Sequence, residues 1–422
     1  MSKQLRIIHL NASSAGGAYV AAQRLSEALN QIENVHSDHL VFEGQLGPHK
    51  VWASNWFLRK CAFMLHALEK LDFLRFEKSK SIRFAFSHAP IGIDLSKHAL
   101  IQQADVIHLH WVNKGFLSLY QIQKLISTGK KIVWTSHDVW PFTGGCYHPR
   151  GCNHFTYGCG NCHYLKQPNT NDLSAKIFKQ KQLIWGKGNI DFVTPSQWLA
   201  NTASLSAMLE CPSEKITAIP NGVNTSFFKP ASNEEKLLVR RKLNLDQDTL
   251  VLMFSAANLT NAAKGFTEFL QLCEGLQGKG IRVSAIIIGD KRGAEFVSSV
   301  NTTYLGFLGH KEPLRDAYWA ADIYVTTSHE ENLPTTIMES LSCGVPVAAF
   351  KVGGIPEMIV EEQTGVLSDL LNVEELTDKV ALFIKSAIVQ NSTETREKCK
   401  KFAENHYSDA VIAKEYYKVY CK

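Results

Sequence analysis

The sequence predicts an α/β protein with two Rossmann-like, doubly wound parallel-sheet domains that face each other across a cleft. Its 422 residues are too many for one ordinary domain, since single domains typically hold about 100–200 residues. Short apolar runs alternate with helical patterns, which is typical of parallel sheets covered by helices on both faces. The alternation pauses after the turn Pro220-Asn221-Gly222 and then restarts, which predicts the second domain.

The first domain is predicted over residues 1–220. It opens with an apolar run from Leu5, a glycine turn at Gly16-Gly17 and a helical pattern that ends at Leu29. Further elements alternate along the rest of this half. Strands are expected over residues 38–43, 104–111, 131–138 and 190–196, and helices over 116–127 and 197–209.

The second domain is predicted over residues 221–405, and residues 406–422 are predicted to form a separate C-terminal helix. The same alternation of strands and helices marks this half. Strands are expected over residues 250–257, 283–290, 303–309, 322–328 and 345–350, and helices over 373–388, 393–405 and 409–421.

Composition narrows the class of protein. Hydrophobic residues at 45% and charged residues at 20% exclude a disordered, collagenous or wholly coiled-coil chain. The net charge of +5 suits anionic partners such as nucleotides or a phospholipid surface and does not require nucleic acid. The apolar run before Asn11 is too short for a secretory signal, and no run approaches the roughly 20 residues of a membrane span. We therefore expect the chain in the cytoplasm.

The most informative stretch runs from Ser328 to Glu357. A strand ends at Ser328, a short loop follows, and Pro334 opens a helix. Backbone amides at a helix start favour phosphate oxygens. Glu331 in the loop and Glu339 in the helix can accept hydrogen bonds from sugar hydroxyls. The alternative is a solvated acidic loop followed by one glutamate on a helix surface.

The pattern Glu331-x7-Glu339 is followed by SCGVPVAAF and by VGGIPE at residues 352–357, and IPNGVN stands at residues 219–224. Together with the Gly16-Gly17 turn, these motifs resemble family 4 of the glycosyltransferases, the group 1 class with the GT-B fold. The segment TSHDVWPFTGGC, at residues 135–146, is similar to a bacterial subgroup that assembles surface polysaccharides such as lipopolysaccharide.

The resemblance implies an enzyme that moves a sugar from a nucleotide-diphosphate sugar to a glycan or lipid-linked acceptor with retention of anomeric configuration. It implies that the first domain serves the acceptor, that the second mainly binds the donor, and that the C-terminal helix crosses back to the first domain. No metal or cofactor is then required for catalysis.

The resemblance also implies roles for single residues. Glu331 would bind hydroxyls of the donor sugar, Glu339 the ribose, and Lys264 the diphosphate. Ala262 and Ala263 stand before Lys264, where the family commonly has a basic residue. The implied catalytic residues are His137, Lys264 and Glu331. The implied donor-binding residues are Gly16, Gly17, Asn258, Lys264, Glu331, Asn332, Leu333 and Glu339.

Three histidines lie near strand ends. His137 lies at the end of the strand that begins at Lys131, at the edge where active-site residues of such sheets lie, and the resemblance implies that it faces the donor sugar and phosphate. His108 and His110 are two residues apart, so they share one face of a strand. They are candidates for the acceptor pocket, and packing in the core is an equal alternative.

Four cysteines, Cys146, Cys152, Cys159 and Cys162, fall in one glycine-rich segment. Four thiolates can hold a structural zinc, and the closing Cys-x2-Cys pair suits one, although the first pair is spaced by five residues. Disulfides and reduced thiols that pack a loop are the alternatives.

The segment from Trp56 to Phe86 mixes aromatic residues with Lys and Arg. Such a stretch can lie on an anionic membrane surface, which would place the chain peripherally on the inner face of the cell membrane. Helices that pack on the first domain with their lysines in water are the alternative.

Two other functions compete with sugar transfer. A nicotinamide-dependent Rossmann oxidoreductase is disfavoured because Gly16-Gly17 does not form G-x-G-x-x-G. A zinc-containing nucleic-acid-binding protein is disfavoured because the basic residues are too few and too dispersed. We therefore expect no nucleic-acid partner.

Overall fold

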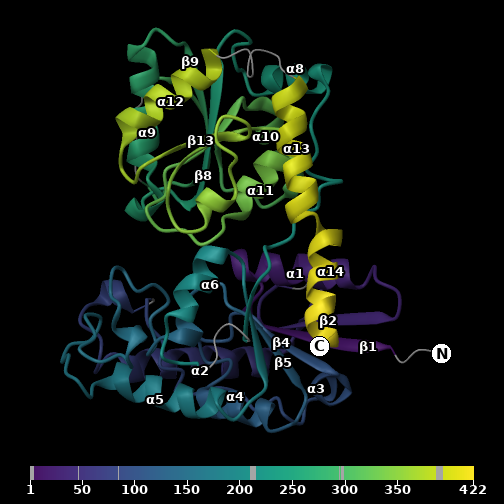
Figure 1. Ribbon diagram of the computed structural model, residues 1–422, viewed down its shortest axis with the longest axis vertical. Helices are drawn as coiled ribbons and strands as arrows, with labels where there is room; N and C mark the ends of the chain where they lie inside the picture. Colours follow the sequence, from purple (N-terminus) through teal and green to yellow (C-terminus); the bar gives the residue numbers. More distant parts are fainter. Residues whose placement is uncertain are drawn as a thin grey trace. The chain divides into compact units, whose positions relative to one another are not determined.

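The computed structural model describes residues 4–422 except 46, 84, 210–214, 294, 296–298 and 386–392. The chain divides into two compact units (Figure 1). Unit 1 consists of Met1–Gly222 with Ile412–Lys422, and unit 2 consists of Val223–Val411.

Unit 1 contains a parallel sheet that has seven strands in the described residues, in the order β3-β2-β1-β4-β5-β6-β7. The chain starts in β1, adds β2 and β3 on one side, and then adds the remaining strands on the other side. The strand order therefore reverses at β1. The strands are β1 (Leu5–Ser13), β2 (Val35–Glu43), β3 (Lys50–Val51), β4 (Val106–Leu109), β5 (Lys131–Thr135), β6 (Ile190–Thr194) and β7 (Ile216–Ala218).

Helices cover both faces of this sheet (Figure 1). Alternate strand residues point to opposite faces. Ile7 and Val106 pack with Leu25 on one face, whereas Ile8 and Ile107 belong to the core on the other. The described helices are α1 (Gly17–Leu29), α2 (Trp56–Phe73), α3 (Ala99–Gln103), α4 (Leu119–Ile126), α5 (Leu173–Trp185) and α6 (Gln197–Ser204).

Polar side chains fix where several helices begin. Ser118 caps α4, Asp172 caps α5 and Ser196 caps α6, and each side chain accepts a hydrogen bond from a backbone N–H of the first turn. Such caps satisfy amides that have no partner inside the helix.

Unit 2 contains a second parallel sheet, with six strands in the part of the chain that the structure describes, in the order β10-β9-β8-β11-β12-β13. Here the order reverses at β8. The strands are β8 (Leu250–Asn258), β9 (Val283–Asp290), β10 (Asn301–Gly306), β11 (Ile323–Thr326), β12 (Val347–Phe350) and β13 (Gly365–Ser368). The helices are α8 (Asn233–Lys242), α9 (Phe266–Gly278), α10 (Lys311–Ala320), α11 (Thr335–Ser342), α12 (Val373–Lys385) and α13 (Thr393–Tyr407).

The last helix, α14 (Asp409–Cys421), contributes to the core of unit 1. Its Ile412, Tyr416 and Tyr420 pack on the same face of the sheet as Val106 and Val133. The most C-terminal segment of the chain is thus part of the N-terminal unit.

The predicted architecture of two Rossmann-like, doubly wound domains is confirmed, whereas the predicted cleft between them stays a prediction. Several boundaries shift inward: β4 is shorter than the predicted strand 104–111, and α4 begins at Leu119 because Ser118 caps it. Residues 386–388 of the predicted helix 373–388 lie outside the described residues. Among the described helices, none has the length and apolar character needed to cross a membrane.

Candidate functional site

The loops at the carboxyl ends of β8, β11 and β12 lie next to each other in unit 2. These three strands are neighbours in the sheet, and the strand order reverses at β8. Ligands of open α/β sheets bind at the carboxyl ends of strands, where the order reverses. The residues of these loops are therefore the first candidates for a binding site.

Lys264 and Glu331 meet at this edge. Lys264 ends a short 3-10 helix, Ala262–Lys264, after β8, and Glu331 lies in the loop after β11. The Lys264 Nζ donates to Glu331 Oε1 at 2.5 Å. Both side chains reach solvent, with exposed fractions of 34% and 17%. The edge thus presents an ammonium group that can neutralise a phosphate, beside a carboxylate that can accept hydrogen bonds from hydroxyls.

Gly265 brings the first two loops together. Its φ is +71°, and a Cβ at this position would stand 1.8 Å from the carbonyl oxygen of Thr327. The Thr327 hydroxyl donates to the Gly265 carbonyl at 2.6 Å, and the His329 N–H donates to the Ala263 carbonyl at 2.9 Å. Only glycine permits this approach, and it places Lys264 opposite Glu331.

Gly353 supports the same site from the loop after β12. Its φ is +56°, and a Cβ there would stand 1.8 Å from the carbonyl oxygen of Glu331. The N–H of Gly354 donates to the Asn332 carbonyl at 2.8 Å. Gly353 and Gly354 therefore hold the backbone of Glu331 and Asn332 in place.

Glu339 lies on α11 and is buried. The Tyr318 hydroxyl donates to Glu339 Oε2 at 3.3 Å. The pKa of Tyr324 is raised to about 12, mainly by burial and to a smaller extent by the charges of Glu331 and Glu339. Tyr324 thus lies near both carboxylates, so the structure brings the two predicted glutamates to one neighbourhood.

The other predicted donor residues of unit 2 have local roles. The Asn258 side chain accepts hydrogen bonds from the N–H and hydroxyl of Thr260, which shapes the loop after β8. Leu333 is buried in the hydrophobic core. Its side chain therefore packs, and only its backbone remains for a ligand.

Gly16 and Gly17 lie at the start of α1 in unit 1, after β1. Gly16 has φ +88°, and a Cβ built at either glycine would meet nothing within 4 Å. The N-terminus of α1 has no side-chain cap. Its first amides therefore have room for an anion.

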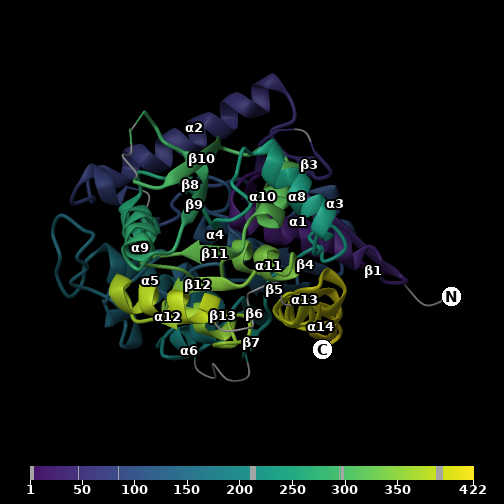
Figure 2. The same cartoon turned by 90° about the horizontal axis from the view of Figure 1, so that it is seen from above.

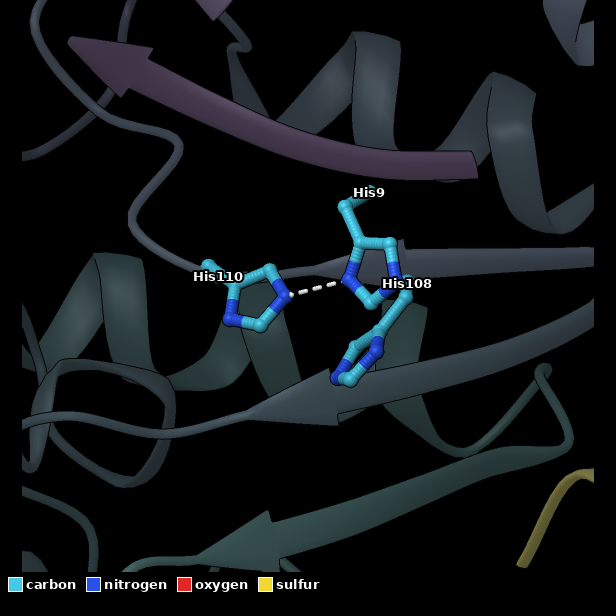
Figure 3. Close-up of side chains that lie close together, drawn as sticks. All are labelled: His9, His108 and His110. Atoms are coloured by element: carbon cyan, nitrogen blue, oxygen red, sulfur yellow. Dashed lines mark hydrogen bonds between the residues drawn. The ribbon is translucent and has the colours of Figure 1, made fainter. Parts of the chain in front are cut away.

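A row of histidines crosses the sheet of unit 1. His39, His9 and His108 are register partners on β2, β1 and β4, so their side chains share one face of the sheet. His110 follows on the same face, and His137 stands two residues after β5. Figure 3 shows His9 and His110 joined by a hydrogen bond with His108 beside them.

The histidine row is neutral. Burial is the main cause that lowers the pKa of His137 to about 4 and of His39 to about 3. Burial and the neighbouring imidazoles hold the pKa of His9, His108 and His110 well below 6.5. The sequence predicted three of these five residues. His9 and His39 were missed, although each lies in an apolar strand pattern where a polar residue is unusual.

The predicted acceptor residues have different partners. His108 is completely buried, and its two nitrogens lie 2.8 Å from the hydroxyls of Tyr420 and Thr135. His110 instead lies between His9 and His137. The packing alternative thus describes His108 better than His110.

Asp138 is a further group that the sequence did not single out. Burial raises its pKa to about 7, and the Trp140 N–H donates to its Oδ1 at 2.8 Å. The fully buried Lys181 donates to the carbonyls of Trp140 and Thr143 close by. The position of Asp138 directly after His137 was the available signal.

The four cysteines line one small cavity and are free thiols. Among the described residues, the only His, Cys, Asp or Glu group whose ligand atoms lie within 4.8 Å of one another is His9, His108 and His110. No three of the cysteine sulfurs reach that spacing. A structural zinc at Cys146, Cys152, Cys159 and Cys162 stays a prediction.

Comparison with known proteins finds a family match within unit 2. Residues 236–406 match the family described as "Glycosyl transferases group 1", and this range includes Lys264, Glu331 and Glu339. The chain is 24% identical over 206 residues, 47% of this chain and 52% of the relative, to N,N'-diacetylbacillosaminyl-diphospho-undecaprenol alpha-1,3-N-acetylgalactosaminyltransferase of Campylobacter jejuni. It is 27% identical over 255 residues, 58% of each chain, to the putative colanic acid biosynthesis glycosyl transferase WcaC of Escherichia coli. The chain thus spans about half the length of these curated relatives.

Solved structures support the fold of both units. The crystal structure of Anabaena Alr3699/HepE in complex with UDP has a TM-score of 0.65 at 14% identity, and the match covers 98% of this chain and 99% of that one. The likeness confirms the predicted GT-B fold, and the family match confirms the predicted resemblance.

Proposed function

We propose that this chain, whose residues 236–406 match the group 1 glycosyltransferase family, transfers a sugar from a nucleotide-diphosphate sugar to a glycan or lipid-linked acceptor. The observation that carries the proposal is the pair of Lys264 and Glu331 at the carboxyl edge of the unit 2 sheet. A cation and a carboxylate side by side match the two ends of such a donor, a diphosphate and a polyhydroxylated ring.

The chemistry asks for charge stabilisation at the leaving group. The bond between the anomeric carbon and the diphosphate oxygen breaks, and the electron pair stays on the diphosphate. The Lys264 ammonium neutralises that charge as it develops. The acceptor hydroxyl forms the new bond from the face that the diphosphate leaves, and its proton passes to the departing phosphate oxygen. The anomeric configuration is then retained.

Glu331 and Glu339 would select the donor. Glu331 is partly exposed beside Lys264 and its backbone is held by Gly353, so it is placed to accept hydrogen bonds from sugar hydroxyls. Glu339 is more deeply placed and is the proposed partner of the ribose. In unit 1, His137 and the backbone amides of Gly16 and Gly17 are the proposed contacts for a sugar or phosphate.

The names of the relatives support a lipid-linked acceptor and a role in bacterial surface polysaccharide synthesis. One relative is named for an undecaprenol diphosphate compound and another for colanic acid biosynthesis.

A donor panel tests the proposal. The purified chain is incubated with UDP-, GDP- and ADP-sugars, and release of the nucleoside diphosphate is measured with and without lipid-linked glycans. We expect slow hydrolysis of one class of donor and, with an acceptor, a product of unchanged anomeric configuration by NMR. If no nucleotide sugar is hydrolysed or raises the melting temperature, while NAD or an oligonucleotide does, the proposal is wrong.

We further propose that α2 docks the chain on an anionic membrane. Large apolar side chains on this helix and just after it are exposed. From Met64 to Leu74 they recur at a spacing of four and three residues, and two more stand seven residues before Phe63 and Met64, which is the spacing of two helical turns. Figure 2 shows α2 as one uninterrupted helix. We call these residues the α2 surface: Trp56, Phe57, Phe63, Met64, Leu68, Leu71 and Leu74.

Basic residues accompany the α2 surface. Exposed cations stand on the helix and directly after it, at Arg59, Lys60, Arg75, Lys78 and Lys80. Each Lys or Arg near an anionic surface contributes about 1 kcal/mol of binding free energy. The Lys60 ammonium lies 3.9 Å from the Trp56 ring centroid, so charge and aromatic surface coincide. Apolar side chains beside cations match the acyl and headgroup layers of an anionic leaflet.

Vesicle flotation tests this part. We expect binding to vesicles of phosphatidylglycerol and none to phosphatidylcholine alone. The triple variant Trp56→Ser, Phe57→Ser, Phe63→Ser should lose binding, whereas Leu183→Ser, an equally exposed residue on α5, should keep it. Failure of the wild-type chain to float with anionic vesicles, or equal loss in the Leu183 variant, would count against docking through α2.

A further inference from the structure

Four thiols of unit 1 surround one small cavity. Cys146, Cys152, Cys159 and Cys162 all line it, together with His154, and its volume is about 20 Å³. A cavity of this size holds roughly one water molecule, which is also the room that a single metal ion needs. All four cysteines are free thiols. We call these four residues the cysteine cluster.

The members of the cysteine cluster are close enough for their charges to interact. A negative charge on Cys159 affects both Cys146 and Cys162, and Cys152 in turn affects Cys159 and Cys162. No three of the sulfurs lie within 4.8 Å of one another, whereas zinc–sulfur bonds of about 2.3 Å bring four sulfurs to about 3.8 Å. Metal binding therefore requires that the cysteine side chains turn toward the centre of the cavity.

The backbone of the closing Cys-x2-Cys pair is held by groups outside the pair. The Gly160 N–H donates to the Ser174 hydroxyl oxygen at 3.1 Å, and the Cys162 N–H donates to the Asp172 carboxylate at 2.8 Å. Cys159 has φ +60°, a left-handed conformation that is uncommon for a residue other than glycine. Such conformations persist where surrounding contacts hold them, and they recur at ligand-binding sites. With the backbone held, side-chain rotation is the movement that brings the sulfurs together.

One sulfur of the cysteine cluster accepts a backbone hydrogen bond. The Gly144 N–H donates to Cys159 Sγ at 3.2 Å. A Cβ at position 144 would stand 2.2 Å from the carbonyl oxygen of Ser174, so glycine allows this N–H to approach. A hydrogen bond to sulfur stabilises negative charge there, and bonds of this kind orient the ligands of protein metal sites.

A buried amine lies beside the cysteine cluster. Lys181, on α5, is fully buried, and its Nζ donates to two backbone carbonyls at 2.5 and 3.0 Å. The acidic groups that act on it are those of Cys146, Cys159 and Asp138. A buried ammonium is costly unless negative charge lies nearby. Four thiolates around one Zn²⁺ carry two net negative charges, so such a site and this ammonium would stabilise each other.

We propose that the cysteine cluster binds one zinc ion through four thiolates, and that the Lys181 ammonium offsets part of the negative charge of this site. Each thiol gives its proton to solvent as its sulfur–zinc bond forms. Four protein ligands leave no coordination position for a substrate, so the zinc is structural. Tetrahedral sulfur sites hold zinc or iron–sulfur clusters, and the small cavity favours the single ion. The site lies within unit 1 and is independent of the proposed function, since no step of sugar transfer uses it.

Metal analysis of the full chain, purified without chelator, tests the proposal first. We expect one zinc ion and no iron per chain. The zinc content should fall to background after dialysis of Cys159→Ser and of Cys162→Ser. Cys273→Ser removes a buried thiol of α9 in unit 2, and this control should keep all of its zinc. No bound metal in wild-type protein, iron in place of zinc, or full zinc content in the two cluster variants would overturn the proposal.

Cobalt substitution of the wild-type chain gives an answer even where a cluster variant fails to fold. The visible absorption of bound Co²⁺ reports the coordination geometry, and charge transfer from sulfur reports the number of thiolates. We expect a tetrahedral site with four thiolates. A spectrum without charge transfer from sulfur would overturn the proposal and move the metal to His9, His108 and His110, whose ligand atoms lie within 4.8 Å of one another.

Two lysines of α5 test the role of the buried charge. Lys181→Gln removes the charge and keeps an N–H for the carbonyls, and we expect zinc affinity to fall by about tenfold in competition with a coloured chelator. Lys181→Met, which also loses those hydrogen bonds, should lose at least as much affinity. Lys179→Gln removes an exposed charge from the same helix and should bind zinc as the wild type does. Equal affinity in the Gln variants of Lys181 and Lys179 would overturn the role of Lys181.

Discussion

The two sheets carry different kinds of polar side chain around the strand at which the strand order reverses. In each unit the strand order reverses at the first strand, and polar side chains gather on or just after the strands around it. In unit 1 these groups are buried, neutral imidazoles. In unit 2 they are a partly exposed ammonium and carboxylate. The same topology therefore serves two tasks: unit 2 can compensate the charge of a diphosphate, whereas unit 1 can offer hydrogen bonds without adding charge.

Burial explains the difference. Removing an imidazolium from water is unfavourable, and each neighbouring imidazole adds repulsion, so the row in unit 1 stays deprotonated. Lys264 and Glu331 instead pair with each other and still reach water. This difference predicts that a change of pH acts mainly on unit 1. It also predicts that a change of charge or backbone near Lys264 and Glu331 acts on unit 2.

The largest expected effect is acid sensitivity of unit 1. The five histidines of the row have pKa values below the 6.5 of the unfolded chain, so between about pH 4 and 6.5 the unfolded state binds more protons. Stability therefore falls as the pH is lowered through 6.5. Asp138 acts in the opposite sense, because its pKa is raised to about 7 and its contribution grows as the pH falls. Because the row holds five such histidines against one such carboxyl group, the net effect between pH 6.5 and 5.5 is a loss of stability.

Hydrogen exchange resolved by peptide, measured from pH 7 to 5 and corrected for the intrinsic exchange rate, checks this prediction. Strands β1, β4 and β5 should lose protection, whereas β8 and β11 should change little. The described histidines of unit 2, at positions 310, 329 and 406, are not buried, so this unit is the internal control. A parallel loss of protection in both units would contradict the assignment of the pH dependence to the histidine row.

The next effect concerns charge at the edge of unit 2. Lys264→Ala removes the ammonium that stabilises the leaving diphosphate, and we expect donor turnover to fall by about 10²–10³-fold, as for the loss of one preorganised donor. The melting temperature should change little because the pair is partly exposed. Lys351→Ala, which removes a pair with Asp369 on the same unit, is the control. Equal rates in the two variants would remove Lys264 from the leaving-group site.

The sequence was sufficient to predict much of this contrast. Buried parallel strands appear in a sequence as continuous apolar runs, so the end of each run marks the carboxyl end of a strand. This pattern placed His137, Lys264 and Glu331 at the carboxyl edges of the sheets. The motifs around Glu331 and Glu339 predicted a donor site, and the structure puts both residues near Tyr324.

Other features required the strand register and the backbone path. His9, His39 and His108 lie about 30 and 100 residues apart, and only the pairing of β2, β1 and β4 makes them one row. The approach of Gly353 to the Glu331 carbonyl depends on two loops whose paths no local pattern specifies. The same holds for Tyr420, which reaches His108 from the far end of the chain.

A smaller effect should follow from displacing Glu331 without changing any charge. In Gly353→Ala the new Cβ would clash with the Glu331 carbonyl, so we expect the loop to shift and donor affinity to fall by about tenfold, with a stability loss of roughly 1–3 kcal/mol. Gly306→Ala is the matched control, because Gly306 also has a positive φ but a Cβ there meets nothing within 4 Å. Calorimetric titration with the donor measures the affinity. Similar losses of affinity in both variants would assign the effect to backbone strain alone.

The smallest effect tests whether His108 belongs to the site or to the core. Tyr420→Phe removes the hydroxyl that lies 2.8 Å from His108 Nδ1, and the loss of one buried hydrogen bond should cost about 1 kcal/mol in urea unfolding. Because His108 has no bond to His9, His110 or His137 among the described contacts, turnover should stay within about twofold. Tyr417→Phe on the same helix, at a more exposed position, should change neither quantity. A large loss of turnover in Tyr420→Phe would instead connect α14 and His108 to the reaction, and the imidazoles of unit 1 would then act as one group.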